Sequence, residues 1–130
     1  MEQAIRIQIP AIQVDAPVVQ GDNWEQLKKG VGQQVGTPDP GNKGNIVLSG
    51  HNDVYGEVFR YLDRLAPGDK VIIFTSRRQD IYVITGIQMV EPTAVEVMAQ
   101  TSDARVTLIS CHPYLIDDHR IVGSAILQSR

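Results

Sequence analysis

The sequence is a succession of short β-type segments joined by turn residues, and no long helical pattern interrupts them. Alternating or compact apolar runs predict strands at 5–9, 14–19, 45–48, 71–74, 79–90, 105–111 and 120–127. Brief helical turns are predicted at 23–29, 56–65 and 94–99. Many short strands with so little helix predict an all-β barrel or sandwich rather than a parallel α/β sheet.

Length and charge narrow the class of protein. The 130 residues suit one compact domain over 1–130, and the net charge of −3 comes without a basic run that would bind nucleic acid. No apolar stretch reaches the ~18 residues needed to span a membrane. The first residues lack the basic and apolar regions of a signal peptide. We therefore expect either a cytosolic protein or a catalytic domain trimmed of such a segment.

The single cysteine, Cys111, excludes both a disulfide within the chain and a multi-cysteine zinc site. It lies at the end of the strand predicted at 105–111, because Pro113 cannot donate to a strand ladder. A strand end holds the backbone rigidly while the side chain faces a cleft, which suits a nucleophile. The alternative is an inert cysteine buried in the core.

A cysteine attacks an amide carbonyl as its thiolate, so it needs a histidine that protonates the leaving amine and a donor for the oxyanion. We favour His51, which follows a strand and a glycine, as that histidine. His112 neighbours Cys111 in an extended segment and should face the opposite side. His119 bears the same relation to Arg120. A loop histidine bonded to water remains the alternative for His51.

Arg120 begins the last predicted strand, after a loop at 113–118. Two strands joined in this way are expected to be antiparallel neighbours, which brings Cys111 and Arg120 together. A guanidinium stays charged and presents several N–H groups, so it suits the oxyanion. The alternative for Arg120 is a surface salt bridge to Asp117 or Asp118.

Three motifs together resemble those of sortases. Residues 107–111 (TLISC) resemble the family's T-L-x-T-C signature, with serine in place of the usual threonine. Residues 49–52 (SGHN) and 118–122 (DHRIV) resemble the segments that carry the family's catalytic histidine and arginine. The order histidine, cysteine, arginine also agrees, and the likeness extends over most of the chain.

The resemblance implies an eight-stranded β-barrel with short helices in the connections. It implies cleavage of an L-P-x-T-G-type sorting motif between threonine and glycine through a thioester, with transfer to an amine. Cys111 would be the nucleophile, His51 the general acid and later base, and Arg120 the oxyanion or substrate donor. Ser110 and Asn52 are expected to bind substrate.

The same resemblance implies the partners and the location of the protein. The partners would be surface proteins or pilins with a sorting motif, and an amine of the cell wall or a pilin lysine. The protein would lie at the bacterial cell surface, held by an N-terminal membrane anchor that is absent from this chain. The compact form is closer to housekeeping-like or class D and E sortases than to the pilin class.

We expect no cofactor and no metal ion. Some sortases bind calcium, but Asp53, Glu57 and Asp63 are scattered and form no ligand loop. Two other functions stay open at this point. One is a cysteine peptidase or hydrolase that uses water instead of an amine, and the other is a non-catalytic β-barrel binding module.

Overall fold

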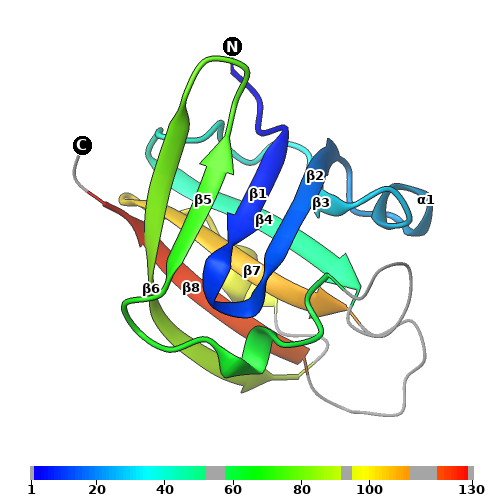
Figure 1. Cartoon of the computed structure of the whole chain (residues 1–130), viewed down its shortest axis with the longest axis vertical. Helices are drawn as coiled ribbons and strands as arrows, with labels where there is room; N and C mark the ends of the chain where they lie inside the picture. The colour runs from blue at the N-terminus through cyan, green and yellow to red at the C-terminus, as the bar shows by residue number, and fades with distance from the viewer. Residues whose placement is uncertain (1, 52–57, 92–94, 112–119, 129–130) are drawn as a thin grey trace.

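The structure is a computed structural model that describes residues 2–51, 58–91, 95–111 and 120–128. Its elements in chain order are β1 (Arg6–Ile9), η1 (Pro10–Ile12), β2 (Val14–Gln20), α1 (Trp24–Leu27), β3 (Val31–Gln33), β4 (Gly44–His51), η2 (Leu62–Arg64), β5 (Lys70–Phe74), β6 (Gln79–Val90), η3 (Val95–Met98), β7 (Ala104–Cys111) and β8 (Arg120–Leu127). The eight strands of these residues close a barrel in the order β1-β2-β3-β4-β7-β8-β6-β5 (Figure 1). The predicted all-β barrel is confirmed.

The barrel is mixed rather than fully antiparallel. β2 pairs with β3, and β4 pairs with β7, in parallel, whereas the other neighbours are antiparallel. Pro17 lies inside β2 opposite Arg6, although a proline lacks a backbone donor. The pairing of β2 with β3 begins only at Val18, and the Val18 amide donates toward β1, to the carbonyl of Ile5 at 3.0 Å. The missing N–H of Pro17 therefore costs the ladder no hydrogen bond.

The helical turns were predicted in part. The turn predicted at 23–29 contains α1, which Asn23 caps by accepting a hydrogen bond from the Gln26 backbone amide at 3.0 Å, and Leu27 is buried. The short helix predicted at 56–65 is wrong for the described part, which holds only the 3₁₀ turn η2.

Spacing explains that error. The side chains that reach the core are Phe59, Leu62 and Leu65, three residues apart, and this is the period of a 3₁₀ turn rather than of an α-helix. Tyr61, which a helix over 56–65 would place on the same face as Leu62 and Leu65, is instead 39% exposed. β3 was not predicted, because three residues are too few to show alternation.

The barrel interior is filled by alternate residues of the strands. Ile46 and Leu48 of β4 and Val106 and Leu108 of β7 belong to the main core. The intervening positions face outward, and Val47, Ile109 and Val122 form a second, smaller apolar cluster there. Val97 and Met98, from the segment between β6 and β7, pack on that cluster. The outer face of the strand pair β4–β7 is therefore partly covered.

Candidate active site

The ends of β4 and β7 lie side by side. The two strands run parallel and in register from the pair Gly44 and Ala104 to the pair His51 and Cys111. Neighbouring strands are separated by about 4.8 Å, so the backbones at His51 and Cys111 are immediate neighbours. Two residues that are remote in sequence thus meet at one end of the barrel.

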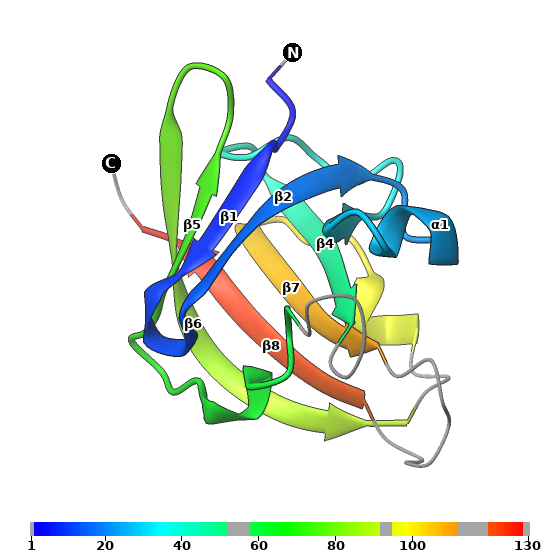
Figure 2. The same cartoon turned by 45° about the vertical axis from the view of Figure 1, so that its right-hand side comes forward.

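Arg120 begins the next strand of the barrel, β8, at the same end. β8 is antiparallel to β7, as predicted, and Val122 pairs with Ile109. Continuing this register by two residues sets Arg120 opposite Cys111. The side chain of Arg120 is half-buried, and its backbone pairs on the other side with Val90, the last residue of β6. Figure 2 shows the ends of β4 and β7 beside the start of β8.

The three candidate catalytic residues therefore occupy adjacent positions on three adjacent strands, with Cys111 on the central one. Their catalytic roles remain predictions. His112, His119 and Asn52 lie outside the described residues, as do Asp117 and Asp118. The choice of His51 over the other histidines also stays a prediction.

Ser110, the expected substrate contact, lies on the inner face of β7. It is 1% exposed, and its Oγ has no hydrogen-bond partner among the described residues. Its register partner is Gly50, where an added Cβ would lie 2.9 Å from the Phe59 ring. The serine is thus enclosed at the end of the barrel, and a substrate would reach its hydroxyl only if these neighbours moved. Substrate binding by Ser110 stays a prediction.

Asn45, the first residue of the strand predicted at 45–48, is the centre of a polar cluster, called here the Asn45 hub. Its side chain is buried and donates to the carbonyls of Val97 and Ala99, both at 3.1 Å. Its Oδ1 accepts from the Thr107 hydroxyl at 2.7 Å. The backbone N–H of Asn45 donates to the side-chain oxygen of Gln100, and the side-chain nitrogen of Gln100 donates to the Asn45 carbonyl, each at 2.9 Å.

These contacts tie the segment that follows β6 to both strands that end at the candidate site. The signal for this hub in the sequence was an asparagine beside the apolar run Ile46–Leu48. A side-chain amide that is buried with such a run needs hydrogen-bond partners.

Two carboxylates have perturbed pKa values, and neither belongs to the ends of β4 and β7 or to the start of β8. Hydrogen bonds from the Arg105 guanidinium, at 2.8 and 2.7 Å, lower the pKa of Asp103 to about 2. This pair stands at the start of β7, at the other end of the strand from Cys111. Hydrogen bonds from Arg6 and then Gln8 lower the pKa of Asp15 to about 2.

Among the described residues, no three histidine, cysteine or acidic side chains gather as metal ligands. Of the calcium candidates, only Asp63 belongs to the described part, where it lies exposed in η2. Within the same part, no helix combines the length and apolar character of a membrane span.

Curated relatives resemble the chain over most of its length. It is 31% identical over 109 residues to sortase D of Bacillus subtilis strain 168, a match that covers 83% of this chain and 54% of that protein. It is 31% identical over 107 residues to sortase A of Bacillus anthracis, covering 82% of this chain and 50% of that protein. The chain thus spans about half the length of these two relatives.

Solved structures extend the likeness to the fold. A sortase E mutant from Streptomyces avermitilis superposes with a TM-score of 0.87 at 31% identity, covering 98% of this chain and 89% of that one. A Clostridium perfringens sortase D5 transpeptidase gives a TM-score of 0.87 at 28% identity, covering 98% and 79%. The sortase domain model matches residues 7–128. With a family model over nearly the whole chain and a shared barrel, this protein belongs to the sortase family.

Proposed function

We propose that the protein is a cysteine transpeptidase that uses Cys111, His51 and Arg120. The observation that carries the proposal is the register of β4, β7 and β8. It places a histidine, a cysteine and an arginine at neighbouring positions at one end of the barrel. Membership of the sortase family supports it, because the motifs at these positions match those of the family.

The chemistry follows from the three groups. The Cys111 thiolate attacks the carbonyl carbon of the scissile peptide bond, and the oxyanion that forms accepts hydrogen bonds from the Arg120 guanidinium. The C–N bond breaks as protonated His51 gives its proton to the leaving amine, which leaves a thioester on Cys111. Neutral His51 then takes a proton from an incoming amine as that amine attacks the thioester. An amide forms and the thiolate is released.

The substrate we propose is an L-P-x-T-G-type sorting motif cleaved between threonine and glycine. The acceptor is an amine of a cell-wall peptide or of a pilin lysine. The protein carrying this domain would act at the bacterial cell surface, held by an N-terminal membrane anchor. The named relatives, which include sortases D, E and A, support this class of substrate.

A ligation assay tests the proposal. The protein is incubated with a fluorescent L-P-x-T-G-type peptide and triglycine, and the products are separated by mass spectrometry. Ligated peptide supports the transpeptidase, whereas hydrolysed peptide alone would identify a hydrolase. Cys111→Ala is the matched control and should form neither product.

A second measurement separates catalysis from a non-catalytic barrel. Iodoacetamide should modify Cys111 in the native protein, since a nucleophile must be reachable by substrate. A thiol that reacts only after denaturation would argue for an inert cysteine. Mass spectrometry of adducts with a panel of sorting peptides would then identify the preferred motif.

A further inference from the structure

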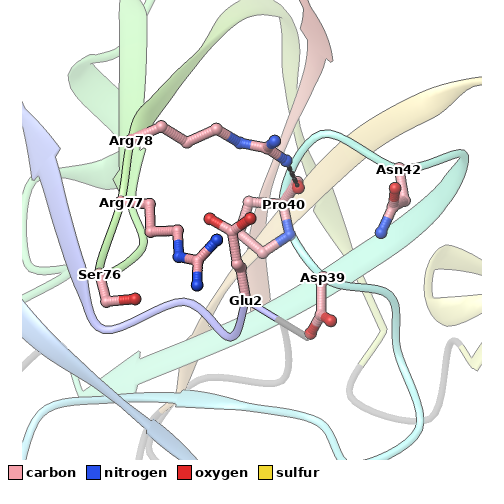
Figure 3. Close-up of a pocket in the computed structure, with 7 residues that line it drawn as sticks. All are labelled: Glu2, Asp39, Pro40, Asn42, Ser76, Arg77 and Arg78. Carbon is pink, nitrogen blue, oxygen red and sulfur yellow. Dashed lines mark hydrogen bonds between the residues drawn. The ribbon is translucent and has the colours of Figure 1, made fainter.

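Figure 3 shows a polar hollow of the structure, whose volume is about 470 Å³. The strand directions place it at the end of the barrel opposite the candidate active site. It forms where the loop before β4 meets the β5–β6 hairpin and the first residues of the chain. β4 ends at His51, and β6 ends at Val90 beside Arg120, so both strands run away from the hollow. The polar side chains that line it belong to Glu2, Asp39, Asn42, Ser76, Arg77 and Arg78.

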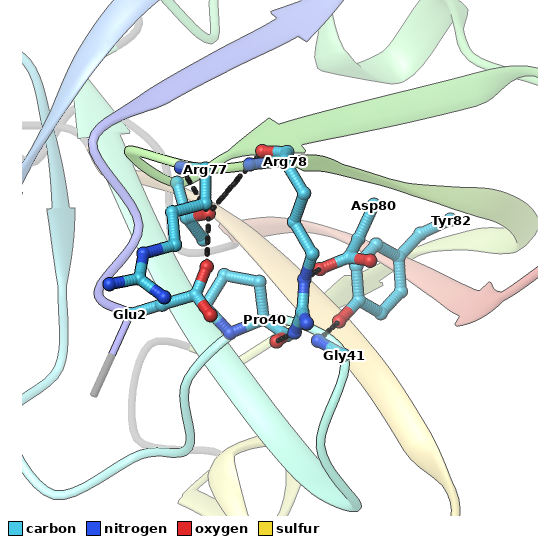
Figure 4. Close-up of polar contacts among 8 residues, drawn as sticks. Glu2, Pro40, Gly41, Arg77, Arg78, Asp80 and Tyr82 are labelled. Atoms are coloured by element: carbon cyan, nitrogen blue, oxygen red, sulfur yellow. Dashed lines mark hydrogen bonds and ion pairs between the residues drawn. The ribbon is translucent and has the colours of Figure 1, made fainter.

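Thr75 organises one wall of the hollow. This residue is 6% exposed, and its hydroxyl accepts hydrogen bonds from the backbone amides of Arg77 at 3.3 Å and Arg78 at 3.2 Å. The same hydroxyl donates to Oε1 of Glu2 at 3.0 Å. The first residues of the chain are thereby attached to the hairpin turn, and the Glu2 carboxylate is held at the hollow (Figure 4).

Hydrogen bonds of Arg78 and Tyr82 hold the opposite wall of the hollow in place. The Arg78 guanidinium donates to the buried carboxylate of Asp80 at 3.2 Å and to the carbonyl of Pro40 at 2.9 Å. The Tyr82 hydroxyl accepts from the Gly41 amide at 2.9 Å. These bonds hold the loop before β4 against the hairpin, so the hollow has a fixed frame rather than two independent loops.

The charges that remain at the hollow are of both signs. Asp80 balances Arg78, whereas the Arg77 guanidinium and the Asp39 carboxylate have no hydrogen-bond or ion-pair partner among the described residues. The Glu2 carboxylate is bonded only to the Thr75 hydroxyl in that same part of the chain. One cation and two anions therefore line a single hollow without charged partners there.

We propose that this hollow binds a small zwitterion, namely an amino acid or short peptide with a free amine and a free carboxylate. The Arg77 guanidinium, aided by the Asn42 amide and the Ser76 hydroxyl, supplies donors for the carboxylate. Glu2 and Asp39 supply the negative charge for the ammonium. A phosphate would be repelled by these two carboxylates, and a divalent cation would be repelled by Arg77.

Titration of the ¹⁵N-labelled protein with glycylglycine tests the proposal. We expect saturable amide shifts at 39–42 and 75–78. N-acetyl-glycylglycine and glycylglycine amide, which each lack one charge, should bind roughly tenfold more weakly. If either capped peptide bound as tightly as glycylglycine, the proposal that the ligand is a zwitterion would be overturned. The absence of saturable shifts in the hollow, or shifts confined to the ends of β4 and β7, would overturn the site.

Two variants assign the charges. Arg77→Gln and Glu2→Gln should each weaken glycylglycine binding by roughly tenfold while the remaining amide signals stay in place. Arg64→Gln, which removes an exposed guanidinium stacked 4.1 Å from the Tyr61 ring centroid, is the matched control and should bind normally. Unchanged binding by both hollow variants would show that Arg77 and Glu2 are ordinary solvated charges.

Discussion

His51 and Cys111 are register partners at the ends of two parallel strands, β4 and β7. Arg120 begins the antiparallel strand on the other side of β7, two residues before Val122, which pairs with Ile109. The central strand of this trio thus carries the only cysteine of the chain.

His51→Ala should lower kcat/KM for peptide ligation by roughly a thousandfold, because the leaving amine then lacks its proton donor. His112→Ala should leave ligation largely intact, since His112 is expected to face away from Cys111. Steady-state ligation kinetics of the two variants compare them directly. If His112→Ala were as damaging as His51→Ala, the choice of histidine would be wrong.

Arg120→Lys should reduce kcat/KM by roughly a hundredfold or more, since a compact ammonium does not reproduce the fork of N–H donors. The melting temperature should hardly change, because Arg120 is only half-buried. Arg105→Lys, at the far end of β7, is the matched control. Near-normal turnover by Arg120→Lys would remove this residue from the mechanism.

Asn45→Ala should lower the free energy of unfolding by about 1–3 kcal/mol. The change leaves the carbonyls of Val97 and Ala99 and the hydroxyl of Thr107 without their present partners. Because the segment over the outer face of β4 and β7 is then less well held, KM should rise more than kcat falls. Chemical denaturation and ligation kinetics measure the two effects.

Thr107→Val provides the comparison for Asn45→Ala, because it removes a single hydrogen bond of the same hub. Its effects on stability and on KM should be smaller. A loss of kcat alone in Asn45→Ala, with KM unchanged, would contradict the positioning role of the hub.

Gly50→Ala should destabilise the protein by about 1–3 kcal/mol through overpacking. The new Cβ would stand 2.9 Å from Cδ2 of Phe59, closer than an ordinary contact. Phe59→Leu in the same chain removes the ring and should recover part of the loss. Thermal melts of the two single variants and the double variant give the coupling, and additive effects would refute the clash.

Acid titration should find the Asp103 carboxyl with a pKa of about 2, below its ordinary value, owing to the hydrogen bonds from Arg105. Because this pKa is lower in the folded than in the unfolded protein, the pair stabilises the fold at pH values above the unfolded-state pKa of ~3.9. The stabilisation is lost as the pH falls toward 2. Since Asp103 is 41% exposed, the contribution should stay below about 1 kcal/mol.

Arg105→Gln should return the Asp103 pKa toward its ordinary value, as measured by ¹³C carboxyl shifts. Asp15, whose pKa of about 2 depends on Arg6 and Gln8, is an internal reference that should not respond. An unchanged Asp103 pKa in Arg105→Gln would contradict the assigned cause.

Local patterns in the sequence determined most of the strands. The bounds of β6 and β8 agree with the predicted 79–90 and 120–127. For β6 the signal was an alternation that extends over many residues, whereas β8 was indicated by its apolar residues. The motifs at 49–52, 107–111 and 118–122 were enough to indicate the family. The three-residue strand β3 and the 3₁₀ turn η2 were not predicted, because short elements take their form from what they pack against.

The antiparallel pairing of β7 with β8 was predicted, but only the tertiary structure decided the other strand neighbours at the site. The parallel pairing of β4 with β7 joins His51 to Cys111 across a long stretch of sequence, and strand alternation contains no information about such partners. The same holds for the Asn45 hub and for the mixed charges at the hollow, which come from loops and hairpins far apart in the chain. Sequence thus determined the residues available for chemistry, and barrel closure decided which of them meet.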